Sequence, residues 1–336
     1  MERMRALLLD SPRPADSAPL RLTDLPAPEP GHGEVRIRIR CCAVCRTDLH
    51  IVEGDLPLPR LPIVPGHQIV GFVDALGGGV HTLKAGDRVG IPWLCSTDGT
   101  CSYCQGQNEN LCEQARFTGY HVDGGYAEYC IVREGFAHPI PAVFSDEHAA
   151  PLLCAGVIGF RAYRLSGAGK GYRLGLYGFG SSAHLVLQLA RYQGCDVYVF
   201  TRGRAHRELA EQLGAVWTGA AEDTPPHPLD ASIIFAPAGA LVPQALRVIR
   251  KAGTLALAGI TMSQIPALDY GLLYHERVVR SVANSTREDC RDFLRVAAEI
   301  PIRPRIQIYP LADANRALQD LKHSRLEGAG VLQLQQ

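Results

Sequence analysis

Two different patterns of apolar residues divide this 336-residue chain. Between residue 6 and about residue 149, short extended apolar segments are broken by glycine and proline, which is typical of strands joined by tight turns. Between about 156 and 284, short apolar strands alternate with helical segments. The first pattern predicts a β-rich domain, and the second predicts a parallel sheet covered by helices on both faces.

The expected elements follow these patterns along the chain. In the first part, strands are expected at 34–41, 69–75, 87–91 and 127–132. In the second part, strands are expected at 174–177, 196–200, 231–235 and 254–257, and helices at 182–192, 206–213 and 241–250. The tail adds a helix at 287–299, a strand at 305–309, a helix at 311–323 and a strand at 330–334. We expect the tail to complete the first domain, so that the two domains are 1–152 with 285–336, and 153–284.

Composition narrows the class of protein. Lysine plus arginine and aspartate plus glutamate are balanced at 34 each, which excludes a strong field for nucleic acid or an anionic membrane and favours a small-molecule partner. The longest apolar runs are too short to span a bilayer, and we expect the segment 1–10 to be a first strand and not a secretory signal. The eleven cysteines are odd in number and unevenly clustered, which favours metal ligands in a reducing cytoplasm over a disulfide scaffold.

A glycine-rich motif follows the first strand of the second part. It has the form GxGxxA and consists of Gly178, Phe179, Gly180, Ser181, Ser182 and Ala183. The first glycine permits a tight turn, the second lets the backbone approach a pyrophosphate, and the small last residue lets helix and strand pack closely. Between a strand and a helix, this motif predicts dinucleotide binding.

The end of the next strand bears on which nicotinamide cofactor is used. An acidic residue there would bind the ribose 2′-hydroxyl of NAD, but the chain has Thr201 and Arg202, and the first carboxylate is Glu208. A hydroxyl and guanidinium groups suit a 2′-phosphate, which favours NADP(H) over NAD(H). The alternative is that these arginines form a solvated face of an arginine-rich chain.

One cysteine cluster has the spacing of a closed zinc site. Cys101, Cys104 and Cys112 supply three thiolates, and a tetrahedral ion needs a fourth ligand. The candidates are Asp98 and Cys95, and we favour Asp98 because a carboxylate oxygen is an acceptable zinc ligand.

A second group of potential ligands is dispersed. Cys45, His67 and Cys154 offer two thiolates and one imidazole, the set expected around a catalytic zinc with an open fourth position. Local spacing does not join them. Considered alone, Cys154 is more typical of a buried core cysteine, and His67 is more typical of a polar residue whose hydrogen bonds are made within a glycine-rich turn.

The motifs together resemble the zinc-containing medium-chain dehydrogenase/reductase superfamily, specifically its bacterial alcohol dehydrogenases. The matching segments occur in family order through nearly the whole chain: CRTDLH, PGHQIVGFV, GDRVGIPWL, the cysteine cluster, FTGYHVDGGYAEY, PLLCAGVIGFRA and GFGSSAH. The resemblance implies a GroES-like catalytic domain built from both chain ends and a Rossmann domain between them. It further implies alcohol or aldehyde substrates and a homo-oligomer, either a tetramer or a dimer.

The resemblance also implies roles for single residues. Cys45, His67 and Cys154 match the catalytic-zinc ligands, and Thr47 and His50 match a proton relay. Two arginines, Arg46 and Arg287, match positions that contact the cofactor. Trp93 matches an aromatic position that walls the substrate pocket, and its alternative role is core packing.

The chain departs from the family pattern at three positions. Gln68 replaces a glutamate behind the metal, Asp98 replaces the first cysteine of the cluster, and Ile158 replaces a threonine near the nicotinamide. Two other functions are therefore considered: a zinc-independent quinone or enone reductase, and a non-catalytic NADP(H)-binding zinc redox sensor. The complete ligand set argues against the first, and the intact relay argues against the second.

Overall fold

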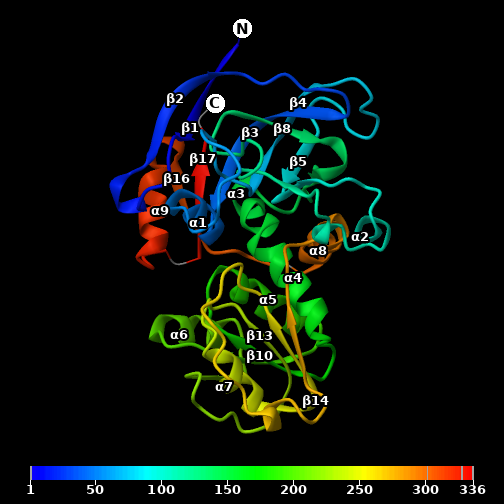
Figure 1. Cartoon of the computed structure of the whole chain (residues 1–336), viewed down its shortest axis with the longest axis vertical. Coiled ribbons are helices and arrows are strands. Elements are labelled where there is room, and N and C mark those ends of the chain that lie inside the picture. The colour runs from blue at the N-terminus through cyan, green and yellow to red at the C-terminus, as the bar shows by residue number, and fades with distance from the viewer. Residues whose placement is uncertain (1, 301, 327, 335–336) are drawn as a thin grey trace. The chain divides into compact units, whose positions relative to one another are not determined.

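The computed structural model describes residues 2–300, 302–326 and 328–334, and the chain forms two compact units. The first unit comprises Met1–Cys154, Ser285–Ala298 and Pro304–Gln336, and the second comprises Ala155–Asn284 and Glu299–Arg303. In Figure 1 the blue and cyan N-terminal strands and the red C-terminal elements accordingly belong to one unit, and most of the yellow segments belong to the other. Cys154 lies at the end of the first unit, in the same unit as Cys45 and His67.

A seven-stranded sheet built from both chain ends organises the first unit. Its strand order is β16-β17-β3-β4-β5-β9, and β8 also pairs with β3. All pairs are antiparallel except β16 with β17, and Gly330 of β17 lies opposite Val44 of β3. The strands are β3 (Glu34–Val44), β4 (Ile69–Leu76), β5 (Arg88–Ile91), β8 (Tyr129–Arg133), β9 (His138–Pro139), β16 (Ile306–Pro310) and β17 (Ala329–Gln333).

Shorter elements connect these strands. Two small antiparallel pairs accompany the sheet: β1 (Arg3–Leu9) with β2 (Leu20–Pro26), and β6 (Leu94–Ser96) with β7 (Arg116–Phe117). The α-helices of this unit are α1 (Arg46–Glu53), α2 (Ser102–Gln105), α3 (Asp146–Ala149), α8 (Arg287–Glu299) and α9 (Ala314–Lys322). The 3-10 helices are η1 (Ala15–Ser17), η2 (Glu109–Leu111), η3 (Glu134–Phe136), η4 (Ala150–Leu153) and η6 (Leu311–Asp313).

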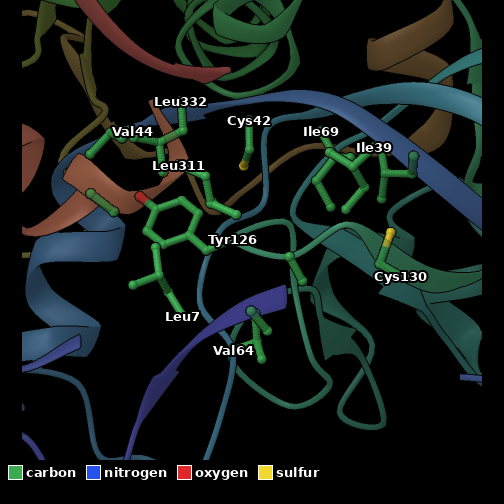
Figure 2. Packing of buried hydrophobic residues seen from close by; sticks show 14 of the residues in the cluster. Leu7, Ile39, Cys42, Val44, Val64, Ile69, Tyr126, Cys130, Leu311 and Leu332 are labelled. Atoms are coloured by element: carbon green, nitrogen blue, oxygen red, sulfur yellow. The ribbon is translucent and has the colours of Figure 1, made fainter. Parts of the chain in front are cut away.

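The core of the first unit positions the segment that carries His67. Figure 2 shows the ring of Tyr126 among Leu7, Leu311 and other apolar side chains, and Tyr126 is fully buried. Gly66 has a φ of 97°, and a Cβ atom there would collide with the Tyr126 ring. Only glycine therefore fits this turn, and the next residue in the chain is His67.

The second unit is a parallel sheet with the strand order β12-β11-β10-β13-β14-β15. This is the order of doubly wound dinucleotide-binding folds, and the predicted α/β fold class is confirmed. The strands are β10 (Arg173–Tyr177), β11 (Asp196–Phe200), β12 (Trp217–Gly219), β13 (Leu229–Ile234), β14 (Ile249–Leu257) and β15 (Val278–Ser281). The helices are α4 (Ala155–Ser166), α5 (Ser181–Tyr192), α6 (Arg204–Gln212), α7 (Leu241–Val248) and the 3-10 helix η5 (Tyr270–Leu272).

Two differences from the expected elements have a local cause. Helix α7 ends at Val248, two residues earlier than predicted, and β14 begins at Ile249 instead of at 254. The apolar signal of β14 is interrupted by the exposed residues Arg250, Lys251 and Ala252, so the sequence pattern indicated only its second half. The helices α1 to α4 and the short strands β2, β6, β7, β9, β12 and β15 were not predicted either. Strands β12 and β15 have only three and four residues, and strands of that length carry little periodic signal.

Candidate active site and nucleotide loop

Cys45 occupies the junction between β3 and α1. It is the N-cap residue of α1, and its Sγ accepts a hydrogen bond from the Thr47 N–H at 3.3 Å. Its own N–H donates to Oδ2 of Asp48 at 2.8 Å, which completes a capping box. The thiol therefore lies at the N-terminus of α1, and the neighbouring Cys154 thiol together with burial raises the pKa of Cys45 well above its usual value.

His67 is oriented by the same carboxylate. Nδ1 of His67 lies 3.0 Å from Oδ1 of Asp48, and both side chains are fully buried. This contact directs Nε2 toward Sγ of Cys45, at 3.4 Å. Burial alone lowers the pKa of His67, but the nearby charges of Asp48 and Cys45 outweigh burial and raise the pKa to about 10. The pocket therefore favours positive charge at this position.

Cys154 brings the third donor atom. It follows η4, and its Sγ lies 3.9 Å from Sγ of Cys45. The ligand atoms of Cys45, His67 and Cys154 all lie within 4.8 Å of one another. A tetrahedral zinc with Zn–S of about 2.3 Å and Zn–N of about 2.1 Å sets S···S at about 3.8 Å and S···N at about 3.6 Å. The measured separations fit such an ion, and so does the chemistry of the donors.

Asp48 is a residue of the site that was not predicted from the sequence. It lies within CRTDLH, three residues after Cys45, and it bonds both Cys45 and His67. The C-x-x-D spacing, which resembles a capping box, was the available signal for its bond to Cys45. The bond to His67 has no sequence signal, because the two residues belong to different elements.

Thr47 and His50 lie one turn apart on α1, so their side chains share a face of the helix. Thr47 is buried, and Nδ1 of His50 lies 2.7 Å from Oδ2 of Asp55. Arg46 is exposed at the first position of α1.

Trp93 and Gln68 flank His67. The Trp93 ring lies 5.9 Å from the His67 ring and stacks on Phe117 at 4.4 Å. Gln68 is 1% exposed, and its amide nitrogen has no hydrogen-bond partner among the described residues. The carboxylate that contacts His67 is that of Asp48. Ile158 lies in α4 of the second unit.

The second donor group of the first unit combines one carboxylate with three thiols. Asp98, Cys101, Cys104 and Cys112 place their ligand atoms within 4.8 Å of one another. The N–H groups of Cys101 and Thr100 donate to Oδ1 of Asp98 at 2.9 and 2.8 Å and hold its pKa well below the usual value. Cys95 is buried in β6 outside this group, and burial raises its pKa to about 11.

Arg287 is engaged by Glu109. Nε of Arg287 lies 2.9 Å from both carboxylate oxygens of Glu109, and Glu109 is only 6% exposed. The guanidinium carbon also lies 4.7 Å from the centre of the Phe136 ring. Arg287 therefore ties α8 to the loop that carries Cys104 and Cys112. The cofactor contact expected of Arg287 stays a prediction, and a phosphate there would compete with Glu109.

In the second unit, the GxGxxA motif connects β10 to α5. Gly178 has a φ of 82°, and a Cβ atom there would lie 3.0 Å from Cβ of Ala236. Gly180 is the N-cap of α5 and has open space around it, so a ligand can approach the backbone closely. Phe179 and Ala183 are buried, and Ser181 and Ser182 begin the helix. The N-terminus of this helix suits a phosphate.

The end of β11 carries the residues that bear on the choice of cofactor. Thr201 is 8% exposed, and its carbonyl accepts a hydrogen bond from Nε of Arg207 at 2.9 Å. Arg202 is exposed, whereas Nε of Arg204 lies 2.7 Å from a carboxylate oxygen of Glu208.

No helix in the described part of the chain is long and apolar enough to cross a membrane.

Comparison with known proteins identifies relatives of both units. The family model described as alcohol dehydrogenase GroES-like domain matches residues 31–142. The model described as zinc-binding dehydrogenase matches residues 183–299.

Individual relatives cover nearly the whole chain. A probable alcohol dehydrogenase AdhA of Mycobacterium tuberculosis is 47% identical over 335 residues, covering 98% of this chain and 97% of the relative. An alcohol dehydrogenase of Geobacillus stearothermophilus is 36% identical over 330 residues, covering 94% and 96%. A cobalt- and zinc-bound thermostable alcohol dehydrogenase from Pyrobaculum aerophilum superposes with a TM-score of 0.90 at 25% identity, covering 99% of this chain and 100% of that one.

Proposed function

Because the chain belongs to the zinc-containing medium-chain dehydrogenase/reductase superfamily, we propose that it is a zinc-dependent alcohol dehydrogenase that uses NADP(H). It would interconvert alcohols with aldehydes or ketones. The observation that carries this proposal is the convergence of Cys45, His67 and Cys154, whose donor atoms have the spacing of a tetrahedral zinc site.

The residues around this cluster have separate tasks in the proposed reaction. A zinc ion held by Cys45, His67 and Cys154 would act as a Lewis acid toward the substrate oxygen. Asp48 keeps the Nδ1 hydrogen of His67 in place and so presents the Nε2 lone pair as the ligand. The Thr47 hydroxyl and the His50 imidazole carry the proton between the substrate and solvent. Trp93, next to His67, forms part of the substrate pocket.

The preference for NADP(H) rests on the end of β11. Glu208 is the nearest carboxylate after the strand, and it is paired with Arg204. Arg202 remains exposed beside Thr201, so a guanidinium and a hydroxyl can meet a 2′-phosphate. A nicotinamide dinucleotide held by the backbone of the Gly178–Gly180 segment would exchange the hydride with the substrate carbon.

The second candidate, a zinc-independent reductase of the same fold, has less support. Such an enzyme has no need of three converging donor atoms or of a buried carboxylate that orients one of them. A non-catalytic sensor likewise has no need of Thr47 and His50 on one helix face.

We also propose that the protein is a homo-oligomer. Strand β15 pairs with β14 on one side and is the last strand on that side of the sheet in the described residues. Val278 in this strand is 47% exposed, and nearby Tyr270 and Tyr274 are 71% and 63% exposed. An edge strand that starts with two valines and lies beside exposed apolar side chains suits sheet extension by a second copy. Sedimentation should show a dimer or a tetramer, and a monomer would contradict this proposal.

Metal analysis and steady-state kinetics together test the proposed enzyme. Purified protein should contain zinc and reduce aldehydes faster with NADPH than with NADH. Cys45→Ser should lose this activity while NADPH still binds, because the nucleotide loop lies in the other unit. Cys195→Ser, which changes a buried cysteine outside both donor groups, is the matched control. Full zinc-dependent turnover by Cys45→Ser would overturn the proposal.

A further inference from the structure

The turn that ends α1 brings the carboxylate of Asp55 to the imidazole of His50. Oδ2 of Asp55 lies 2.7 Å from Nδ1 of His50. We propose that Asp55 is a positioning residue that holds His50 in the tautomer with hydrogen on Nδ1, so that Nε2 exchanges the relayed proton. The proposal rests on the relay role given to His50 under the proposed function.

The backbone fixes this contact. Gly54 takes the left-handed conformation with a φ of 84°, and its N–H donates to the carbonyl of His50 at 3.0 Å. The N–H of Asp55 donates to the same carbonyl at 2.9 Å. The chain therefore folds back over the last turn of the helix, and Asp55 is brought next to the His50 ring. A Cβ atom on Gly54 would lie 2.9 Å from Cβ of Pro12, so glycine is required at this turn for its space as well as for its φ.

The chemistry of the pair determines which nitrogen of His50 is reactive. An ionised carboxylate only accepts hydrogen bonds, so Nδ1 must carry the hydrogen that lies between the two groups. In neutral His50 the lone pair is then on Nε2. A proton that arrives at Nε2 creates an imidazolium beside the negative charge of Asp55. The same proton later leaves Nε2, and the carboxylate of Asp55 accepts the Nδ1 hydrogen bond throughout.

The exposed fractions of the two side chains indicate that Asp55 acts through His50 and does not contact the substrate itself. The His50 side chain is 18% exposed and the Asp55 side chain is 54% exposed, so the carboxylate stands on the solvent side of the imidazole. Asp55 lies five residues from His50 and belongs to neither donor group. Its removal should therefore change the relay and leave both metal sites intact.

The tautomer can be measured directly. Nitrogen NMR of the zinc-loaded enzyme labelled in histidine, with His50→Gln used to assign the signal, should show hydrogen on Nδ1 of His50. In Asp55→Ala the signal should move toward the Nε2-protonated form or a mixture, and Asp55→Glu should restore the original form. A wild-type His50 that carries its hydrogen on Nε2 would overturn the proposal. This measurement does not depend on alcohol dehydrogenase activity.

Kinetics provide the second test. Asp55→Ala should lower kcat by about three- to fivefold with little change in KM, because exposed charge pairs contribute up to about 1 kcal/mol. In the His50→Gln background, Asp55→Ala should have no further effect. An equal loss in both backgrounds would mean that Asp55 does not act through His50.

Controls separate this result from other failures. Asp10→Ala removes a carboxylate that is also 54% exposed and pairs with Arg21, so it should leave kcat unchanged. Thermal denaturation shows whether Asp55→Ala is folded, and Asp55→Glu supplies a second variant if it is not. A wild-type protein without alcohol turnover would refute the proposed function, and the tautomer measurement would still decide the role of Asp55.

Discussion

The carboxylate of Asp48 lies 3.0 Å from Nδ1 of His67, with both side chains fully buried. Its other oxygen accepts the N–H of Cys45 at 2.8 Å. One residue therefore positions two of the three donor atoms of the proposed catalytic zinc site. It also caps α1, the helix that carries Thr47 and His50.

Asp48→Asn should weaken zinc binding at the catalytic site. The amide can donate a hydrogen to Nδ1 and so favour the wrong histidine tautomer, and loss of such a partner lowers metal affinity by about 10- to 100-fold. Competition with a chelator, followed by counting zinc per chain, measures this change. The exposed Asp10→Asn is the control. Unchanged zinc retention in Asp48→Asn would mean that capping α1 is its only role.

Arg202→Ala should change the cofactor preference. Loss of one charge-assisted contact to a 2′-phosphate should lower kcat/KM for NADPH by about 10- to 100-fold and leave NADH nearly unaffected. Arg204→Ala is the matched control, because its guanidinium already pairs with Glu208. If wild type prefers NADH by more than tenfold, the interpretation of Arg202 is wrong.

Arg287→Leu should destabilise the first unit. It leaves the buried carboxylate of Glu109 without its partner, which costs about 2 kcal/mol after allowance for the 36% exposure of the arginine side chain. Urea denaturation measures the loss, and Glu109→Gln combined with Arg287→Leu should recover part of it. A normal urea midpoint with a large rise in KM for the cofactor would instead support the predicted cofactor contact.

Asp98→Ala should remove zinc from the cysteine cluster, whereas Cys95→Ala should not. Asp98 lies within 4.8 Å of the three thiols, and Cys95 does not belong to the group. Metal analysis after gel filtration distinguishes the two variants. Zinc lost from Cys95→Ala and kept by Asp98→Ala would reverse the assignment of the fourth ligand.

Acid should destabilise the protein partly through His138. This residue is 2% exposed, and burial together with the charges of Arg291 and Arg287 lowers its pKa to about 4. In the unfolded chain His138 binds a proton near pH 6.5. The contribution of neutral His138 to the free energy of unfolding is therefore complete above pH 6.5 and is lost as the pH falls toward 4. The interval corresponds to about 3 kcal/mol, because one pH unit is worth about 1.4 kcal/mol.

Urea denaturation at several pH values checks the role of His138. His138→Phe should show a smaller loss of stability between pH 6.5 and 4 than wild type does. Protonation of the metal ligands affects both proteins equally, so the difference between them isolates His138. Identical pH dependence in the two proteins would rule out this role.

Local sequence patterns were enough to predict the α/β class, the strands of the two large sheets except β9, β12 and β15, the helices α5 to α9, and the loop between β10 and α5, but not the helices α1 to α4. These features depend on periodicity and on glycine conformation within a few residues, as at Gly178 with its φ of 82°. Strands β12 and β15 were too short to leave such a pattern. The family resemblance was needed to propose that Cys45, His67 and Cys154 act together.

Packing between distant segments decided the rest. Cys45 and Cys154 are 109 residues apart in the chain, and Arg287 and Glu109 are 178 apart, yet each pair is in contact. Asp48 reaches His67 because β3, α1 and the turn at Gly66 are held together by the core around Tyr126. Periodicity reports which face of an element is buried, but it does not report which side chain it will meet there. The partners of Asp48 and Arg287 therefore became visible only in the folded chain.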